Sequence, residues 1–317
     1  MSLSNFDRKG SETARAAWLY YQEDRTQGEI AQELRVSRST VTRLLQRAKA
    51  EGLVQISLNV TAGTFKAERE LERAYGLEKV RIVPDAADEA AQKRWLGNVA
   101  AELMVQMVGD DSIVVVSWGT TLLAMADALV GQHPVAGAQV VALVGGLHNA
   151  AVGAGTNEIA NRFAAYFNAP ARPLLAPIYV ADEAMAAGLS RDPGIRDALD
   201  LARRASLVVY SFGAMRSEST MFQLDHITPE QLVFLREQGA VGDIACRWID
   251  RNGAAVQLPP SINPIGMSLD EIRAIPQRLA VAGGDFKEEV ILAGVRGGFV
   301  TTLVTDERNA AYLLDKR

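Results

Sequence analysis

Apolar residues in the first fifty positions recur with the spacing of short helices that each bury one side. We predict helices over 11–23, 27–34 and 38–51 because apolar side chains return at i, i+3, i+4 and i+7. The residues on these apolar sides are Ala14, Ala17, Trp18 and Tyr21 in the first helix, Ile30, Ala31 and Leu34 in the second, and Val41, Leu44, Leu45 and Ala48 in the third.

The boundaries of these helices carry their own signals. Thr26 and Glu29 have the spacing of a capping box, in which each side chain bonds the other residue's backbone amide. A three-residue break follows the second helix, and Ser37 at its end is a suitable N-cap for the third. Gly52 is placed to end that helix. Residues 53–58 then alternate like a strand and fit the wing of a winged helix.

The polar side of the third helix is the candidate DNA-binding surface. Ser39, Arg43 and Gln46 lie opposite its apolar side, and such a helix fits the major groove of DNA. Helix N-termini also accept phosphates. We therefore expect a helix-turn-helix whose DNA-contacting residues are Gln27, Arg38, Ser39, Thr40, Thr42, Arg43, Gln46 and Arg47. The alternative is a helical hairpin with a solvated basic side.

The rest of the chain alternates apolar strands with helices, which predicts an α/β fold with a parallel sheet covered on both faces. Strands are expected at 79–83, 112–117, 140–143, 207–211, 242–248, 290–293 and 301–304. Helices are expected at 93–107, 122–130, 157–168, 194–205, 229–238 and 306–314. The domains are therefore 1–58 for DNA binding, 59–76 as a linker with a short bracing helix, and 77–317 as an effector-binding domain.

Ligands of parallel sheets bind in the loops that follow the strands. After the second strand, Gly119, Thr120 and Thr121 open a helix and suit a phosphate or a group of sugar hydroxyls. Gly145 and Gly146 after the third strand leave room for a ligand, although an ordinary turn has the same composition. At the edge of another strand, Asp243 suits two sugar hydroxyls, and Lys287 suits a phosphate or sugar oxygen. Each position also fits an ordinary turn or surface residue.

Charge is distributed unevenly over a chain with a net charge of −5. Residues 8–50 carry +4, and the remainder carries −9, as expected for a DNA-binding module on an acidic body. One cysteine, Cys246, and three scattered histidines match no metal site, so we expect no metal and no cofactor. The apolar runs are too short to span a bilayer and the N-terminus has no signal-peptide pattern, which favours a cytoplasmic protein with no membrane partner.

The segment TQGEIAQELRVSRSTVTRLLQRAKAEGLVQISL closely resembles the helix-turn-helix of bacterial regulators. The chain as a whole resembles the SorC/DeoR-like sugar-responsive transcriptional regulators through VVVSWGTTL, GAVGDIACRWIDRNG and VAGGDFKEEVILAGVRGGFVTTLVTDERNAAYLL. The resemblance implies a second domain related to sugar-phosphate isomerases and CoA transferases that binds a sugar, polyol or sugar phosphate without catalysis. It adds Asn157 to the effector site, and it implies operator DNA as partner and a homo-dimer or homo-tetramer.

The chain departs from this pattern at Val144, where some phosphate-binding members carry a basic residue before the glycine pair. A free sugar or polyol therefore stays open as the effector, with Arg216 as a candidate substitute cation. Two other interpretations also stay open. One is a sugar-phosphate isomerase or acyl transferase fused to a DNA-binding domain, with Asp243 as its base, and the other is a constitutive DNA-binding scaffold with an empty pocket.

Overall fold

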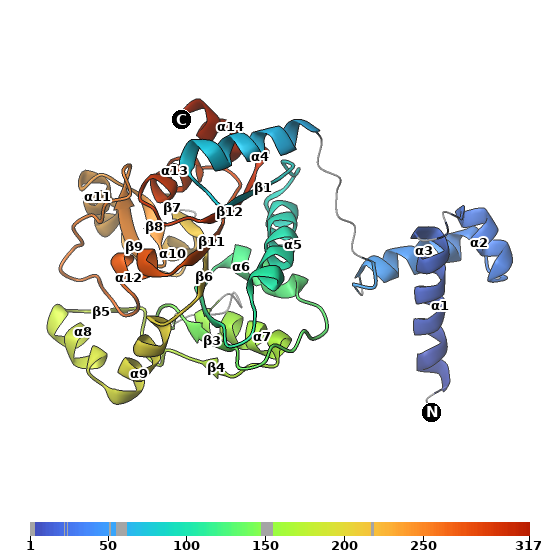
Figure 1. Cartoon of the computed structure of the whole chain (residues 1–317), viewed down its shortest axis with the longest axis horizontal. Coiled ribbons are helices and arrows are strands. Elements are labelled where there is room, and N and C mark those ends of the chain that lie inside the picture. The colour runs from blue at the N-terminus through green and yellow to red at the C-terminus, as the bar shows by residue number, and fades with distance from the viewer. Residues whose placement is uncertain are drawn as a thin grey trace. The chain divides into compact units, whose positions relative to one another are not determined.

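The computed structural model describes residues 4–21, 23, 25–50, 52–54, 62–146, 155–216 and 219–317. The chain divides into two compact units, Met1–Asn59 and Val60–Arg317, which are drawn in Figure 1. We call them the N-terminal unit and the C-terminal unit and describe each by itself.

Three helices form the N-terminal unit: α1 (Ser4–Tyr21), α2 (Gln27–Glu33) and α3 (Arg38–Ala50). Their buried apolar side chains make one small core, consisting of Ala16, Ala17, Leu19, Ile30, Val41, Leu45 and Ala48. The apolar sides predicted for α2 and α3 are confirmed, because Ile30, Val41 and Leu45 are buried there.

The predicted boundaries of α2 and α3 are confirmed to within one residue, whereas α1 begins at Ser4 and not at residue 11. Thr26 and Glu29 form the capping box, with the Thr26 amide 2.8 Å from Glu29 Oε2. At the start of α3, Ser37 Oγ accepts the Thr40 amide at 3.1 Å. Gly52 has a φ of 70°, a left-handed conformation that glycine adopts without strain. Most of the strand predicted at 53–58 lies outside the described residues.

The predicted apolar side of α1 is correct only in part, since Ala17 is buried and Tyr21 is half-buried against the core. Trp18 is 60% exposed and Ala14 is exposed, whereas Ala16, Leu19 and the polar Thr13 are buried. The helix is rotated relative to the prediction because three short helices pack closely and accept small side chains from α1. An indole at the centre of this interface would hold the helices apart, so it lies on the outside.

The C-terminal unit is built on a seven-stranded parallel sheet in the order β1-β12-β11-β6-β2-β3-β4. Its strands are β1 (Lys79–Val83), β2 (Ile113–Val116), β3 (Gln139–Ala142), β4 (Ala171–Arg172), β6 (Leu207–Tyr210), β11 (Gln277–Val281) and β12 (Thr302–Asp306). The helices are α4 (Ala62–Tyr75), α5 (Glu89–Met107), α6 (Thr120–Ala128), α7 (Thr156–Phe167), α8 (Glu183–Ser190), α9 (Pro193–Ala202), α10 (Thr220–Gln223), α11 (Pro229–Glu237), α12 (Leu269–Ala274), α13 (Glu288–Arg296) and α14 (Glu307–Asp315).

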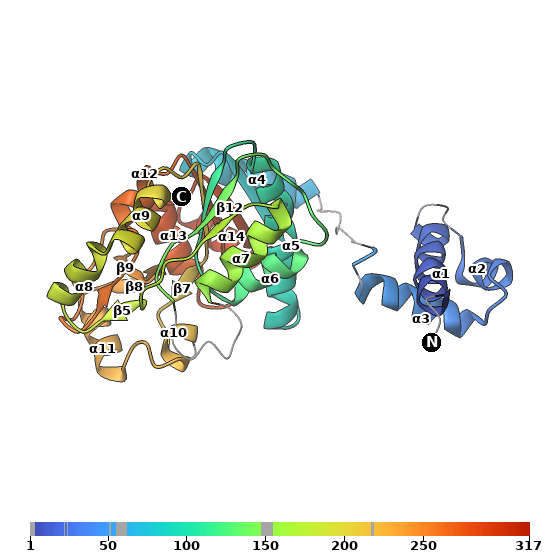
Figure 2. The same cartoon turned by 90° about the horizontal axis from the view of Figure 1, so that it is seen from below.

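Helices cover both faces of this sheet, as the apolar strands predict. In β2, Val114 and Val116 belong to the core under α5 and α7, and Val115 belongs to the core on the opposite face. Figure 2 shows α5, α6 and α7 on one side of the strands, with α9 and α13 on the other. Because every β2 side chain is buried, the strand is apolar throughout and does not alternate.

Two of the predicted strands are wrong in type or extent. Residues 290–293 lie in helix α13, which is buried nearly all round, so its apolar run carries no visible period. Residues 242–248 span parts of two strands, β8 (Ala240–Ile244) and β9 (Arg247–Asp250). In a separate small sheet, β8 is the central strand and pairs antiparallel with β9 on one side and with β7 (Phe212–Ala214) on the other. Strand β11, in the middle of the large sheet, was not predicted. The remaining small sheet pairs β5 (Tyr179–Val180) with β10 (Asn263–Pro264).

Helix α4 covers the free edge of the large sheet. Strand β1 pairs with β12 on one side only, and on the other side its amides meet carboxylates of α4. Glu72 accepts the Val80 amide at 3.1 Å, and the buried Glu68 accepts the Ile82 amide at 3.0 Å. The open edge of the strand is thereby closed to other strands, and α4 packs as part of the C-terminal unit. None of the helices in the described residues is long and apolar enough to cross a membrane.

Candidate functional sites

The side of α3 that faces away from its core carries the predicted recognition residues. Ser39, Arg43 and Gln46, which we call the recognition face, are all exposed, as are Arg38 and Arg47. No carboxylate lies within α3, so five cationic residues between Arg35 and Lys49 share one short segment. The surface is therefore cationic and bears hydroxyl and amide groups, which suits a groove of DNA.

Short hydrogen bonds order the start of α3. Ser37 Oγ lies 2.8 Å from Ser39 Oγ and 2.9 Å from Thr40 Oγ1. Thr42 donates its hydroxyl to Gln27 Oε1 at 3.0 Å, which links α3 to the N-terminus of α2. The predicted DNA-contacting residues at the two helix N-termini thus form one connected surface.

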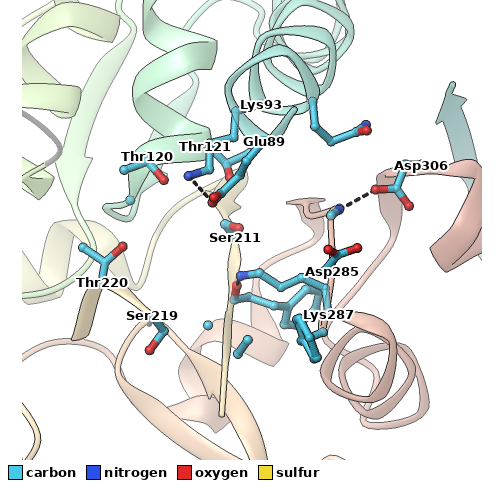
Figure 3. Close-up of a pocket in the computed structure, with 18 of the residues that line it drawn as sticks. Glu89, Lys93, Thr120, Thr121, Ser211, Ser219, Thr220, Asp285, Lys287 and Asp306 are labelled. Atoms are coloured by element: carbon cyan, nitrogen blue, oxygen red, sulfur yellow. Dashed lines mark hydrogen bonds and ion pairs between the residues drawn. The ribbon is translucent and has the colours of Figure 1, made fainter. Parts of the chain in front are cut away.

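A pocket of about 510 Å³ lies at the carboxyl edge of the parallel sheet. It is lined by the loops that follow β1, β2, β6, β11 and β12 together with β7, β8 and the start of α10. Figure 3 shows its polar lining. A volume of this size accommodates a monosaccharide with a phosphate group. Five of the eight predicted effector residues line the pocket: Gly119, Thr120, Thr121, Asp243 and Lys287.

Helix α6 points its N-terminus into this pocket. Gly119, with a φ of 124°, is the N-cap and supplies no side-chain hydrogen bond to the helix amides. Thr120 and Thr121 follow, with Thr121 largely buried. The free amides and the helix dipole favour an anion at this end. Behind the loop, Trp118 donates its indole N–H to Cys246 Sγ at 3.1 Å, which anchors the floor of the pocket.

Asp243 is a buried carboxyl, only 3% exposed, at the end of β8. Its Oδ2 accepts the Cys246 amide at 2.9 Å and so holds the β8–β9 turn, where Ala245 and Cys246 both have positive φ. Burial raises the pKa of Asp243 to about 6, although the Cys246 amide and the nearby Lys287 charge oppose this. Any side chain at Gly213 would collide with this carboxylate.

Lys287 reaches across the pocket floor, and its ammonium group donates a hydrogen bond to the Phe212 carbonyl. Burial lowers the pKa of Lys287 to about 8, while the charge of Asp243 raises it. The two charges therefore support each other in a site from which much of the water is excluded. Coupled groups of this kind, with pKa values near neutrality, are typical of ligand sites.

The glycine-rich loop before α13 is held by Asp306, which is 1% exposed. This carboxylate accepts the amides of Gly284 and Asn309, the latter at 3.0 Å. At the tip of the loop, Phe286 has a φ of 65° and carries the Arg216 guanidinium 4.1 Å from its ring centre. Arg216, the candidate substitute cation, therefore lines the pocket, whereas Val144 is fully buried outside it.

Three predicted effector residues lie outside the pocket lining. Gly145 and Gly146 donate their amides to Ile265 and Ala176, and a side chain at Gly145 would collide with the backbone of Pro177. Asn157 accepts the Leu174 amide at 3.3 Å and lies beside Gly146. Close backbone packing therefore accounts for Gly145, whereas a Cβ at Gly146 would make only ordinary contacts. Residues 147–154, which join these positions, are outside the described part of the chain.

The sequence prediction missed Glu89 and Lys93 in the first turns of α5. Both line the pocket, and Lys93 Nζ lies 2.6 Å from Glu89 Oε1. Their i, i+4 spacing is the only signal in the sequence, and it is shared with many surface ion pairs.

The same two units are recognised by comparison with protein families. The profile of the Sugar-bind family, a sugar-binding domain, matches residues 60–315, and a MarR family profile matches residues 16–62. The chain is 32% identical over 302 residues to the deoxyribonucleoside regulator of Bacillus subtilis, covering 95% of this chain and 96% of that protein. The chain belongs to the SorC/DeoR-like sugar-responsive transcriptional regulators.

Other relatives of this regulator agree with that assignment. The transcriptional regulator LsrR of Escherichia coli K12 is 29% identical over 307 residues, covering 96% of this chain and 94% of that protein. The sugar-binding domain of a transcriptional repressor from Vibrio fischeri superposes with a TM-score of 0.73 at 25% identity, covering 80% of this chain and 98% of that one. Full-length SorC of Klebsiella pneumoniae shares the fold, with a TM-score of 0.72 at 23% identity over 95% of this chain and 98% of that one. This regulator therefore combines a DNA-binding helix-turn-helix with a sugar-binding α/β domain.

Proposed function

We propose that this regulator controls a carbohydrate-utilisation operon in response to a phosphorylated sugar bound in the pocket at the edge of the sheet. The observation that carries the proposal is the meeting, in one pocket, of the N-terminus of α6, which lacks a side-chain cap, with the buried Asp243 and the half-buried Lys287. In this arrangement the phosphate accepts the amides and hydroxyls of Thr120 and Thr121. The sugar hydroxyls bond to Asp243 and Lys287.

Two further cations support a phosphorylated effector over a neutral sugar. Arg216 and Lys93 line the same pocket and compensate for the missing basic residue at Val144. Because Gly145, Gly146 and Asn157 lie outside the lining, we assign them a supporting role in the loop that follows β3.

The recognition face of α3, together with Gln27, Arg38, Thr40, Thr42 and Arg47, is proposed to bind the operator. One short helix reads only a few base pairs, so specificity requires at least two half-sites. We therefore propose a homo-dimer or homo-tetramer in the cytoplasm, where operator DNA is found. Light scattering of the purified chain tests this assembly, and a monomer at micromolar concentration would contradict it.

We propose that the pocket binds its effector without turning it over. Asp243 is the carboxyl that an isomerase reading would use as base, but it is already engaged with the Cys246 amide and the Lys287 charge. Conversion of a sugar phosphate by the purified protein, followed by NMR, would instead support the enzyme reading.

A thermal-shift panel of sugars, polyols and their phosphates tests the effector class directly. A ligand at a hundred times its dissociation constant stabilises the fold by about 2.7 kcal/mol, which is a readily measured shift. We expect phosphorylated sugars to stabilise the wild-type chain and the Arg43→Ala variant alike, and the Thr121→Ala variant less. Stabilisation by neutral sugars alone would overturn the phosphate assignment, and no shift at all would favour a constitutive scaffold.

A further inference from the structure

Charged side chains are unusually dense in the effector pocket. Six carboxylates and four cationic side chains are among its described lining residues. Five of the carboxylates are held by backbone amides or by Arg308: Asp85, Asp88, Asp243, Asp285 and Asp306. Each of these five therefore has a partner within the protein that helps to order the loops around the pocket.

Glu89, the sixth carboxylate, is bonded differently. Its Oε1 lies 2.6 Å from the ammonium of Lys93, one turn further along α5. The side chain of Glu89 is 78% exposed, whereas that of Lys93 is 28% exposed. The lysine is thus fixed in the wall of the pocket, and the carboxylate reaches in from the solvent side.

The pair lies where the proposed phosphate would bind. Figure 3 shows the Lys93 ammonium and the Glu89 carboxylate grouped with Thr120 and Thr121 at the helix end of the pocket. Hydrogen bonding from Lys93 holds the pKa of Glu89 below its usual range, and the charges of Lys287 and Arg216 lower it further. The same cations on which a ligand's anionic group would depend therefore favour the ionised form of Glu89.

We propose that Glu89 is a tethered placeholder that occupies the position of the effector's anionic group until the effector displaces it. This rests on the proposed function, because it assumes an anionic effector. An exposed carboxylate leaves its partner at little cost, since such pairs contribute little to stability. A phosphate dianion makes stronger hydrogen bonds to the same cations than a carboxylate does.

The placeholder makes Glu89 a specificity-determining residue. The carboxylate of a monoanionic sugar acid bonds to Lys93 no more strongly than the Glu89 carboxylate does. Such a ligand therefore gains little affinity by displacing Glu89. A neutral sugar leaves the pair in place. The pocket is thereby biased toward phosphorylated ligands even though several carboxylates line it.

The test is the affinity of the full-length Glu89→Gln variant for inorganic phosphate, measured by calorimetric titration at constant ionic strength. The matched control is Glu183→Gln. Glu183 also follows an aspartate N-cap as the first acidic residue of its helix, but it lies outside the pocket lining. We expect Glu89→Gln to bind phosphate about fivefold more tightly than wild type, the size of one exposed ion pair, and Glu183→Gln to bind like wild type.

A second variant makes the test independent of any general effect of Glu89→Gln. If Glu89 neutralises Lys93 in the free chain, Lys93→Gln weakens phosphate binding little in the wild-type background. It weakens binding several-fold in the Glu89→Gln background, where the cation is free. Equal losses in the two backgrounds would show that the residues act separately and would overturn the placeholder.

The outcomes also separate this inference from the proposed function. Phosphate that binds wild type and Glu89→Gln equally, or binds the variant more weakly, overturns the placeholder and leaves the phosphorylated effector standing. If neither phosphate nor any sugar phosphate binds wild type, both fail. The ratio of phosphate affinity to acetate affinity should differ between Glu89→Gln and wild type. An equal ratio in the two proteins would also contradict the specificity role.

Discussion

The recognition face takes its side chains from a single helix, whereas the effector pocket draws on loops that lie between Asp85 and Arg308 in the sequence. On α3 the polar side chains are exposed and bond mostly to residues within three or four positions. In the pocket, Asp243 accepts the amide of Cys246 three residues along, but Lys287 crosses to the Phe212 carbonyl on β7, and both side chains are at least in part removed from water.

This difference sets the energetic weight of each side chain. Substitution of an exposed arginine changes the free energy of unfolding little, and its main effect is on DNA affinity. Removal of a buried charge leaves its partner uncompensated, so the substitution weakens both ligand affinity and folding stability. The two sites are therefore expected to respond to substitution on different scales.

Lys287→Met is expected to have the largest effect. Loss of the ammonium removes the positive charge that favours the ionised form of the buried Asp243 and removes a proposed effector ligand. This costs about 2 kcal/mol or more, or at least about thirtyfold in affinity. Calorimetry with the effector found in the ligand panel measures it. Operator affinity of the effector-free chain is expected to stay unchanged.

The control for this prediction is Lys66→Met, which removes an exposed lysine from α4 outside the pocket lining. Its effector affinity is expected to equal that of wild type. A Lys287→Met protein with wild-type effector affinity would place the ligand elsewhere and would end the contrast between the two sites.

Arg43→Ala is expected to weaken operator binding by about 1–3 kcal/mol if its guanidinium reads a guanine. Effector affinity should not change. Electrophoretic mobility shifts with operator and with scrambled DNA measure the specific part of the loss. Lys49→Ala removes a like charge from the last turn of α3, so a smaller loss that is the same for all DNA sequences is expected there. Equal losses in the two variants would contradict direct base reading.

Sequence reasoning predicts the local site better than the distributed one. Thr26, Ser37 and Gly52 act within a few residues of themselves, so their roles as caps follow from spacing alone. The same holds for the polar side of α3, because the helical period fixes which residues share it. Trp18 shows the limit, since two apolar sides of α1 overlap and only tertiary packing selects between them.

The pocket depends on which strands are neighbours, and the sequence does not state this. Gly119 and Lys287 were found because strand-to-helix loops are where ligands of parallel sheets bind. Lys93 was not found, because its pairing with Glu89 acquires meaning only when α5 and α6 lie side by side. The helix α13 was taken for a strand because its apolar run Val-Ile-Leu-Ala is buried on all sides.

The pH dependence of effector binding should reveal the titration of Lys287. Its amino group carries a proton below about pH 8, so affinity is highest there and falls above, by at most about tenfold per pH unit. The free energy of unfolding moves the opposite way. The pKa of Lys287 is lower in the folded chain than its ordinary value of 10.5, so its destabilising effect is full below about pH 8 and disappears as the pH rises from there toward 10.5.

Asp243→Asn sharpens this prediction. The negative charge of Asp243 raises the pKa of Lys287, so its removal should shift the fall in affinity to lower pH. The asparagine oxygen still accepts the Cys246 amide, which preserves the turn. Effector affinity of the two proteins, measured between pH 7 and 9, gives the shift. An unchanged midpoint of the fall in affinity would show that Asp243 does not influence the protonation of Lys287.

The smallest expected effect comes from removing one capping box in each unit. Thr26→Ala removes the acceptor of the Glu29 amide in α2, and Thr228→Ala removes the equivalent acceptor of the Gln231 amide in α11. Each loss costs about 1 kcal/mol of local stability, or about fivefold faster amide exchange in that helix. Hydrogen exchange of the full chain measures both. Because the two units have separate cores, Thr26→Ala should leave the exchange of α11 unchanged, and Thr228→Ala should leave that of α2 unchanged. Faster exchange in both units after either substitution would show that the two units open together. It would contradict the independent unfolding on which the contrast between the two sites depends.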